Sequence, residues 1–536
     1  MFIKEIDLVN RFIKKNPNRA DLVSYRSSAQ KKFCVKVYRN HSFEFISSII
    51  HPYLDLSDID INFEMSDYDD SLSFTDLDEN KLKKFDAIVL WIDVDRYKHI
   101  SLNSFLEDRL NYLRGVTSKP ILAVFCGKII HLKVSDILIL NVNEVLNSTN
   151  DNIIYDESLI SFTGTRLTRN NSSKISKILG VKYFPYLFNF CFKAVITDLD
   201  NTLYDGVLGE DGLNGIKIPE SYLKLQSYLK KLSDNGFFLC IVSKNVESDV
   251  INLLSSNRLN LNKSNFTFVK ANWDAKSFNI KEIIKNLNIS PENVLFLDDN
   301  IGELIEVKSR IPNIHVLQAD KDANITLNVL ENYPGLTKFG NNIEDKLRSK
   351  DIIANQKRKI MQKALSNDEY LKSLNMRLKI YVNDLSGAER IAQLGKKTNQ
   401  FIFSYKRYNL NEIVNLLNQE NYLILSFHLS DVLSDSGMIG AAMFKHDRNV
   451  VLLDELFISC RALGRNVENI IILKALIFAL DYFNEKNLSF NFIKGERNIP
   501  AESFYYNNLI KFDYAKSKKQ IDNQKILNIE VIENGN

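Results

Sequence analysis

The chain has few cysteines, and they are widely spaced. Its 536 residues include five, which are Cys34, Cys126, Cys191, Cys240 and Cys460. An odd number without any CxxC spacing argues against a disulfide framework and against a cysteine-ligated zinc site. The pattern is typical of free thiols in a reducing compartment. We therefore expect a cytoplasmic protein.

The sequence also lacks a long apolar run and a strong net charge. Its most apolar stretch, IIILKALIFAL, is interrupted by Lys474 and is too short to cross a bilayer. The first residues, MFIKEIDLVNRFIKKNPN, are typical of a charged amphipathic helix and not of a signal peptide. The formal net charge of +3 is small for this length. We therefore expect neither nucleic acid nor a membrane surface as a partner.

Length and composition predict a soluble protein with several hydrophobic cores. A hydrophobic share of 45% and a charged share of 25% are ordinary for globular chains. A chain of 536 residues allows roughly two to four domains. We predict an α/β multidomain fold with four parts. They are an α/β domain (1–190), an α/β domain with a parallel sheet (191–325), a charged helical connector (326–374) and an α+β domain (375–536).

The second part alternates apolar strands with amphipathic helices. The predicted strands are KAVITDLD, FFLCIVS, FTFVKA, NVLFLDD and NIHVLQA. The helix between the first two, PESYLKLQSYLKKLSDNG, has Pro219 at its start and Gly236 past its end. Strands that are apolar along their whole length and joined by helices predict a parallel sheet covered on both faces.

Polar side chains follow several of these strands. The set comprises Asp198 and Asp200, Ser243 with Lys244 and Asn245, Lys276, and Asp298 with Asp299. Carboxyl ends of parallel strands meet at one edge, where ligands bind in open sheets. Separated carboxylates suit Mg²⁺, and a hydroxyl beside backbone N–H groups suits phosphate. The set predicts phosphoryl transfer, whereas a pair of aspartates alone would more often be a solvated strand end.

This ordered set resembles the haloacid dehalogenase (HAD) superfamily of phosphotransferases. The resemblance implies that Asp198 is the nucleophile and Asp200 the general acid/base. It implies that Asp198, the backbone carbonyl of Asp200 and Asp298 ligate Mg²⁺, with Asp299 in support. The residues expected to hold the phosphoryl group are Ser243, Lys244, Asn245 and Lys276. No long insert separates the motifs, so we expect no cap domain and a site open to a large or carrier-bound substrate.

Longer stretches are similar to the FkbH-like branch of that superfamily. They are DLDNTLYDGVLGEDGLNGI, IVSKN, ANWDAKSFNI, FLDDN, KKTNQFIFSYKRY and LDELFISCRALGRNVE. The resemblance implies an enzyme that takes a glyceryl unit from 1,3-bisphosphoglycerate and loads it as a thioester on an acyl carrier protein. It thus implies two partners, a phosphorylated three-carbon substrate and the phosphopantetheine arm of a carrier, in polyketide or glycan biosynthesis.

The acyl step of such an enzyme needs a thiol nucleophile, for which Cys460 is the candidate. It lies in ISCRALGR, where Arg461, Arg465 and a following helix N-terminus would favour its thiolate. The alternative is a small buried apolar residue, the commoner role of an isolated cysteine. His428 or His446 is a candidate neighbour in space.

The regions outside the HAD-like part resemble two further folds. Residues 375–536 resemble GNAT acyltransferases, in which the turn at Arg461 and Gly464 would bind the pantetheine arm, although Asn466 replaces a small residue. Asn498 and Tyr505 would line the acyl site, or else cap a helix and face the core. Residues 1–190 occupy the place of an SGNH-like domain but lack its GDS, GxND and DxxH motifs. Ser42 is the nearest candidate for a residual polar site of that kind. We therefore expect this domain to have a docking role and not to hydrolyse a substrate.

Two alternatives to the glyceryl transferase/phosphatase remain. One is a HAD phosphatase fused to a GNAT-type N-acyltransferase that modifies sugars or surface glycans. The other is a scaffold without catalysis, which the complete set of HAD-like residues disfavours.

Overall fold

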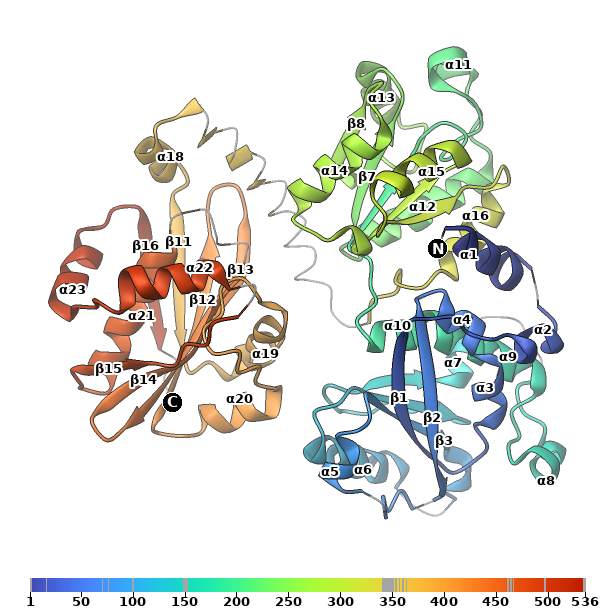
Figure 1. Ribbon diagram of the computed structural model, residues 1–536, viewed down its shortest axis with the longest axis horizontal. Helices are drawn as coiled ribbons and strands as arrows, with labels where there is room; N and C mark the ends of the chain where they lie inside the picture. Colours follow the sequence, from blue (N-terminus) through green and yellow to red (C-terminus); the bar gives the residue numbers. More distant parts are fainter. Residues whose placement is uncertain are drawn as a thin grey trace. The chain divides into compact units, whose positions relative to one another are not determined.

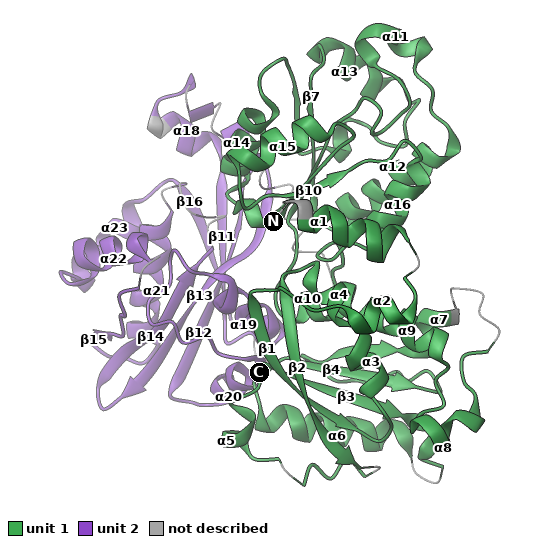
Figure 2. Ribbon diagram, turned by 45° about the vertical axis from the view of Figure 1, so that its right-hand side comes forward, with its two compact units in different colours: residues 1–341 green, residues 342–536 purple. Residues whose placement is uncertain are grey.

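The protein's computed structural model describes most of the chain as two compact units. The described residues are 2–15, 17–69, 71–75, 77–98, 101–147, 153–339, 351, 354–355, 357–358, 361–362, 364–459, 462, 465, 467–495 and 498–533. Residues 1–341 belong to one unit and residues 342–536 to the other (Figure 2). None of the helices in these ranges combines the length and the apolar composition that spanning a membrane requires.

The first unit begins with a five-stranded parallel sheet in the order β2-β1-β3-β4-β5 (Figure 1). Its strands are β1 (Lys31–Arg39), β2 (Ile59–Tyr68), β3 (Ala87–Asp93), β4 (Ile121–Cys126) and β5 (Leu138–Asn141). The apolar runs KKFCVKVYR, FDAIVLWID and KPILAVFC predict three of these strands, and β1, β3 and β4 confirm them. The sequence pattern had missed β2 and β5, which are less completely buried than β3 and β4.

Helices cover both faces of this first sheet. One face packs on α3 (Glu44–Ile49), α4 (His51–Asp55), α9 (Arg169–Ile178) and α10 (Phe184–Leu187). The other packs on α5 (Glu79–Leu82) and α6 (Leu102–Val116). Successive residues of β3 alternate between these cores, Val89 and Trp91 in one and Ile88 and Leu90 in the other. The short elements between them are α7 (Val142–Asn147), η3 (Glu157–Leu159), α8 (Ile160–Thr163) and η4 (Leu179–Tyr183).

A second parallel sheet follows, in the order β10-β9-β6-β7-β8. Its strands are β6 (Ala194–Thr197), β7 (Phe238–Ser243), β8 (Phe268–Ala271), β9 (Val294–Asp298) and β10 (His315–Gln318). All five were predicted from the sequence, and their parallel arrangement is confirmed. The strand β6 ends at Thr197, so both Asp198 and Asp200 lie beyond it.

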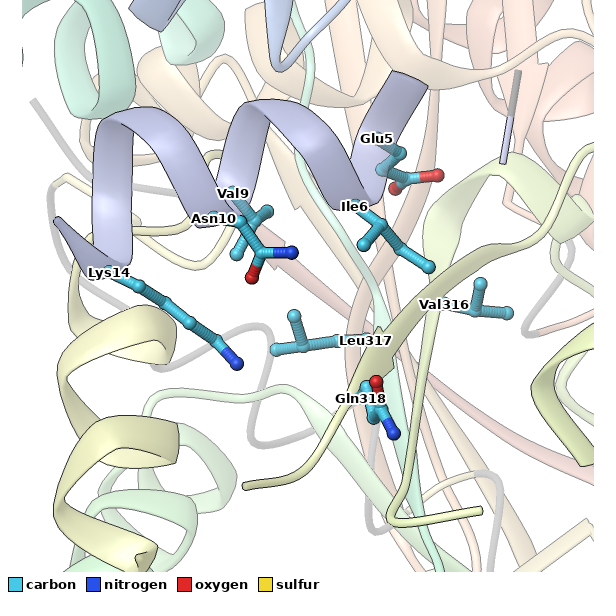
Figure 3. A pocket seen from close by; sticks show the side chains of 8 residues that line it. All are labelled: Glu5, Ile6, Val9, Asn10, Lys14, Val316, Leu317 and Gln318. Atoms are coloured by element: carbon cyan, nitrogen blue, oxygen red, sulfur yellow. The ribbon is translucent and has the colours of Figure 1, made fainter. Parts of the chain in front are cut away.

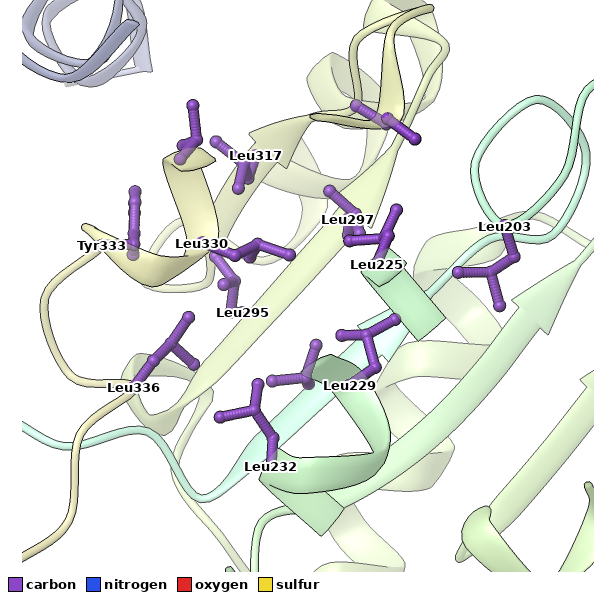
Figure 4. Packing of buried hydrophobic residues seen from close by; sticks show 14 of the residues in the cluster. Leu203, Leu225, Leu229, Leu232, Leu295, Leu297, Leu317, Leu330, Tyr333 and Leu336 are labelled. Carbon is purple, nitrogen blue, oxygen red and sulfur yellow. The ribbon is translucent and has the colours of Figure 1, made fainter. Parts of the chain in front are cut away.

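Leucine side chains form much of the core on one face of this second sheet. Figure 4 shows Leu295 and Leu297 of β9 with Leu225 and Leu229 of α12 (Glu220–Asp234). The helix α16 (Ala323–Glu331) packs beside α12. On the opposite face α14 (Lys276–Leu287) and α15 (Ile301–Arg310) contact β7 and β9. Two short helices, α11 (Leu208–Gly215) and α13 (Glu247–Ser255), contribute buried residues to the same cluster as α12.

The first helix of the chain packs against this second sheet. It consists of α1 (Phe2–Leu8) and the π-helical η1 (Val9–Lys14), and α2 (Arg19–Ser24) follows it. Val9 and Phe12 share a core cluster with residues of the second sheet. Glu5 accepts a hydrogen bond from Tyr333 and lies 3.1 Å from Nδ1 of His315 on β10. A small pocket remains between this helix and the edge strand β10 (Figure 3).

The second unit contains a mixed six-stranded sheet in the order β15-β14-β13-β12-β11-β16. The strands are β11 (Met376–Val382), β12 (Tyr422–Ser430), β13 (Asp435–Asp447), β14 (Val450–Ile458), β15 (Asn487–Phe490) and β16 (Leu527–Glu533). The pairs β14–β15 and β11–β16 are parallel, and the other three are antiparallel. The runs RLKIYV, YLILSFHL, MIGAAMF, VVLLDELFIS and LSFNFIK predict five of these strands, and the sequence pattern did not predict β16.

Helices line this mixed sheet. They are α18 (Asn367–Ser373), α19 (Ala388–Lys397), α20 (Leu410–Leu417), α21 (Glu468–Tyr482), α22 (Ile499–Phe504), η8 (Tyr505–Leu509) and α23 (Tyr514–Asn523). Nine residues of α21 are buried, so its apolar character reflects a core position. The helices α19 and α20 lie over a separate core cluster.

Candidate active site

The polar residues predicted at the strand ends of the second sheet lie together. Asp198 follows β6, Ser243 ends β7, and Asp298 ends β9. Lys276 is the first residue of α14, which follows β8. Because these strands are parallel, their carboxyl ends share one edge of the sheet.

Three carboxylates at this edge have ligand atoms within 4.8 Å of one another, and they belong to Asp198, Asp298 and Asp299. Asp198 and Asp298 are buried, and Asp299 is partly exposed. The buried ammonium group of Lys276 lies 3.1 Å from Oδ1 of Asp198 and 2.6 Å from Oδ2 of Asp298. This donor set of carboxylate oxygens fits Mg²⁺, which prefers oxygen ligands.

The electrostatics of this cluster also fit a cation. Burial raises the pKa of Asp198 even though Lys276 opposes the shift. Burial and the nearby charge of Asp198 raise the pKa of Asp298 to about 7. Burial alone would lower the pKa of Lys276, but Asp198 and Asp298 outweigh it and the pKa is raised. The site therefore gathers more negative charge than one lysine neutralises, and a divalent cation would relieve it.

Asp200 is held by three donors from two segments. Its Oδ1 accepts from Oη of Tyr204 at 2.6 Å and from the backbone N of Leu208 at 3.0 Å. Its Oδ2 accepts from Nδ2 of Asn245 at 2.9 Å, and the same amide donates to Oγ of Ser243 at 3.0 Å. Asn245 thus joins the ends of β6 and β7. Tyr204 had not been singled out in the sequence, although its place four residues after Asp200 was a usable signal.

Lys244 does not contact these groups through any described interaction. Its Nζ lies 2.6 Å from Oε1 of Glu303 on α15 and forms an ion pair there. The predicted phosphate-binding residues therefore divide into Ser243, Asn245 and Lys276, which lie with the carboxylates, and Lys244, which pairs elsewhere.

The segment between β6 and β7 forms no large lid. Asp205 and Lys217 exchange two backbone hydrogen bonds and close a loop that contains only the short helix α11. The helix α12, which follows, belongs to the layer that covers the sheet. This matches the expectation that the HAD-like part has no cap domain.

Half of the predicted acyl site lies outside the described residues. Cys460, Arg461, Gly464 and Asn466 are among these. Arg465 is described and buried, and its Nη2 donates to Asp351 and to Ser436, each at 2.8 Å.

Asn498 and Tyr505 take part in packing within the second unit. The buried amide of Asn498 donates to the carbonyls of Ile402 and Ile493 at 3.0 and 2.9 Å. The ring of Tyr505 stacks on that of Phe492, with 4.7 Å between centroids. Tyr505 thus packs against the core, as its alternative role predicted, whereas Asn498 precedes α22 without capping it through its side chain.

The two candidate histidines have other described contacts. Nε2 of His446 lies 2.9 Å from Oε1 of Glu485. The ring of His428 packs edge-on against Tyr381. Their distance from Cys460 lies outside what the described residues define.

Two sequence stretches that carry the FkbH-like resemblance bind each other in this unit. The carboxylate of Glu455 accepts backbone hydrogen bonds from Ser404 at 2.9 Å and from Lys406 at 2.7 Å. The carboxylate of Asp454 accepts from the hydroxyl groups of Tyr408 and Tyr422. The described residues 404–406 of the first stretch and Glu455 of the second are therefore joined by hydrogen bonds.

Ser42, the candidate for a residual SGNH-type polar site, follows β1 as expected. Its Oγ donates to Oε2 of Glu44 at 2.6 Å. Nδ1 of the neighbouring His41 lies 2.9 Å from Oγ1 of Thr165. Within the described ranges no hydrogen bond joins Ser42 to a histidine, so these residues form no serine–histidine pair.

Known proteins offer a limited comparison. No protein-family model matches the chain. No curated protein matches it. Solved structures that are similar to parts of the chain include the N-terminal part of the protein BF1531 from Bacteroides fragilis, which contains a phosphatase domain complexed with Mg. It is 19% identical, covers 60% of this chain and 97% of its own, and has a TM-score of 0.46.

Two further structures cover a smaller share. A predicted HAD-like family hydrolase from Porphyromonas gingivalis is 17% identical over 24% of this chain and 92% of its own, with a TM-score of 0.20. The 3-deoxy-D-manno-octulosonate 8-phosphate phosphatase from Moraxella catarrhalis, in complex with magnesium, phosphate and KDO, is 14% identical. It covers 26% of this chain and 87% of its own, with a TM-score of 0.20. The structures to which this chain is similar thus include HAD-like phosphatases and hydrolases.

Proposed function

We propose that the second sheet carries a Mg²⁺-dependent phosphatase. The observation that supports it is the cluster of Asp198, Asp298 and Asp299, whose ligand atoms lie within 4.8 Å, with Lys276 between two of them. Solvated strand ends do not bury opposite charges in this way, because burial of charge is costly unless a specific arrangement repays it.

The chain's own residues supply the steps of hydrolysis. A carboxylate oxygen of Asp198 attacks phosphorus, and the bond from phosphorus to the leaving oxygen breaks while Asp200 donates a proton to that oxygen. Asp200 then takes a proton from water, whose oxygen attacks the aspartyl phosphate and releases inorganic phosphate. Lys276 and Ser243 hold the phosphoryl oxygens. Mg²⁺, held by Asp198, Asp298, the carbonyl of Asp200 and supporting Asp299, would neutralise charge on the phosphoryl group.

We further propose that this phosphatase works within a glyceryl transferase of the FkbH-like type. In this proposal the thiolate of Cys460 attacks the acyl carbon of 1,3-bisphosphoglycerate, and inorganic phosphate leaves. Water removes the second phosphate at Asp198, and the glyceryl group passes to the thiol of an acyl carrier protein. The proposal rests on the sequence resemblance, supported by the mutual contacts of Lys406 and Tyr408 with Asp454.

Intact-mass analysis tests both parts. The protein is incubated with Mg²⁺, 1,3-bisphosphoglycerate and a holo carrier protein. We expect a glyceryl adduct on the carrier with the wild-type protein, a phosphorylated adduct with Asp198→Asn, and none with Cys460→Ala. Cys34→Ala is the matched control, since Cys34 lies in the first sheet.

Each outcome bears on a different claim. No Mg²⁺-dependent release of phosphate from any phosphate ester would refute the phosphatase. Phosphatase activity without an adduct on either protein would refute the glyceryl transfer alone. Acyl transfer from acetyl-CoA to an amino sugar without any carrier would favour the N-acyltransferase in place of the glyceryl transferase.

A further inference from the structure

The loop after Asp200 is built around a buried tyrosine. Tyr204 is fully buried, and its hydroxyl donates to Oδ1 of Asp200 at 2.6 Å. Four residues further on, the backbone N–H of Leu208 donates to the same oxygen at 3.0 Å. Both lone pairs of Oδ1 are therefore engaged, while Oδ2 receives one donor, Asn245.

The loop that carries these donors is itself fixed. The side chain of Asn201 accepts from the backbone N of Gly206 at 3.1 Å, and Asp211 accepts from Val207 at 2.7 Å. Gly206 has φ near +121°, and a Cβ there would lie 2.7 Å from Oδ2 of Asp211. Glycine is thus needed at this position. The turn at Gly206 brings the backbone N–H of Leu208 within hydrogen-bond distance of Asp200.

We propose that Tyr204 is a positioning residue that determines which oxygen of Asp200 carries the catalytic proton. This inference rests on the proposed phosphatase function. Because Oδ1 is engaged by two donors and Oδ2 by one, this arrangement directs a catalytic proton to Oδ2. The segment LYDGVL thereby orients the general acid, a task distinct from binding phosphate or metal.

Orientation of a general acid matters most when the leaving group needs a proton. An alkyl phosphate releases an alkoxide, which requires protonation by Asp200 as the phosphorus–oxygen bond breaks. A nitrophenyl phosphate releases a nitrophenolate, which is stable as an anion. The ratio of kcat/KM between these substrates isolates the proton donation, because kcat/KM includes no step after the leaving group departs.

The test compares wild type with Tyr204→Phe on glycerol phosphate and on p-nitrophenyl phosphate. General acid catalysis contributes on the order of 10²- to 10⁴-fold, so partial loss of orientation should lower kcat/KM for the alkyl ester about 10- to 100-fold. The aryl ester should change less than about threefold. Tyr228→Phe is the matched control, because that hydroxyl donates to the carbonyl of Leu330 at 3.2 Å in the same domain.

A second variant covers the case in which Tyr204→Phe does not fold. Leu208→Pro removes the other N–H donor to Oδ1 at the first position of α11, where proline is tolerated. The preceding residue, Val207, already has the extended backbone that proline requires (φ −120°, ψ 114°). We expect the same selective loss on the alkyl ester.

Equal losses on both esters, or no loss on either, would overturn the assignment of Tyr204. A wild-type protein that hydrolyses neither ester with Mg²⁺ would instead refute the phosphatase on which it rests. Mg²⁺ affinity, measured by calorimetry, should be unchanged in Tyr204→Phe. A large fall would also overturn the assignment, because it would place Tyr204 in support of the metal site.

Discussion

Replacing Lys276 with methionine should remove the charge that lies between two buried carboxylates. The Nζ atom lies 3.1 Å from Asp198 and 2.6 Å from Asp298. Methionine is unbranched and apolar and fills irregular gaps, so the change is chiefly one of charge. Breaking a buried ion pair typically costs about 3–5 kcal/mol, because the remaining charge stays buried without compensation.

Protonation of a carboxylate limits this cost and makes it depend on pH. Asp298 already has a pKa raised to about 7 in the wild-type fold, so the added cost falls on Asp198. The ordinary pKa of that group is 3.8, and its protonation costs at most about 4 kcal/mol at pH 7 and about 1.6 kcal/mol at pH 5. We therefore expect Lys276→Met to lower the unfolding free energy of the metal-free protein by about 4 kcal/mol at pH 7 and by less than about 2 kcal/mol at pH 5. Mg²⁺ binds the ionised carboxylates, and at 100 times its Kd would restore about 2.7 kcal/mol.

Thermal unfolding at pH 7 and pH 5, with EDTA or with MgCl₂, measures these effects. A loss of about 4 kcal/mol corresponds to a fall in Tm of roughly 10 °C for a domain of this size. Lys281→Met is the control, since Lys281 is exposed on the same helix. A fall in Tm that is equal at both pH values and unaffected by Mg²⁺ would refute the electrostatic account. It would point instead to lost packing.

Three other predictions concern stability. Phe12→Ala in the first helix should lower the unfolding free energy by about 3–5 kcal/mol. Asn10→Ala, at an exposed position of the same helix, should be nearly neutral. Equal melting temperatures of these two variants would contradict the docking of this helix. Burial lowers the pKa of His41 to about 3, so the unfolded state binds the proton first as pH falls and stability is lost below about pH 6.5. At pH 5 the unfolding free energy of His41→Phe, measured with urea, should therefore have fallen by about 2 kcal/mol less than that of the wild type. Arg358→Met should cost up to about 3–5 kcal/mol, because the buried Asp431 loses the guanidinium at 2.6 Å and keeps Arg465 at 3.2 Å; an unchanged thermal transition would count against it.

Local sequence pattern predicted the strands and their polar ends well. The strands of the second sheet are short apolar runs, so burial on both faces left little ambiguity, and β7 begins within one residue of its predicted start. Convergence of Asp198, Lys276 and Asp298 then follows from the parallel order of β6, β7, β8 and β9. The roles assigned to these residues, and the SGNH-like and GNAT-like resemblances, stay predictions.

Contacts between distant segments could not be predicted in this way. Lys244 was expected to bind phosphate because it follows a strand, but Glu303, 59 residues away, pairs with its side chain. The amphipathic pattern of the first helix predicts an apolar face, yet the pattern does not say which sheet buries that face. The spacing of Tyr204 from Asp200 was a usable signal, but the second donor, Leu208, reaches Asp200 through the turn at Gly206, whose geometry only the folded chain defines.

The docking of the first helix on the second sheet has a consequence for synthesis of the protein. Glu5 and His315 are separated by 310 residues. At translation rates of about 5–20 residues per second, the ribosome needs roughly 15–60 s to make the strand that receives this helix. During that time the first sheet can fold and Phe12 can pack against Tyr25 and Tyr53, while the contact of Glu5 with β10 cannot yet form. The packing of this helix is therefore completed only after the last strand of the second sheet, β10, has been made.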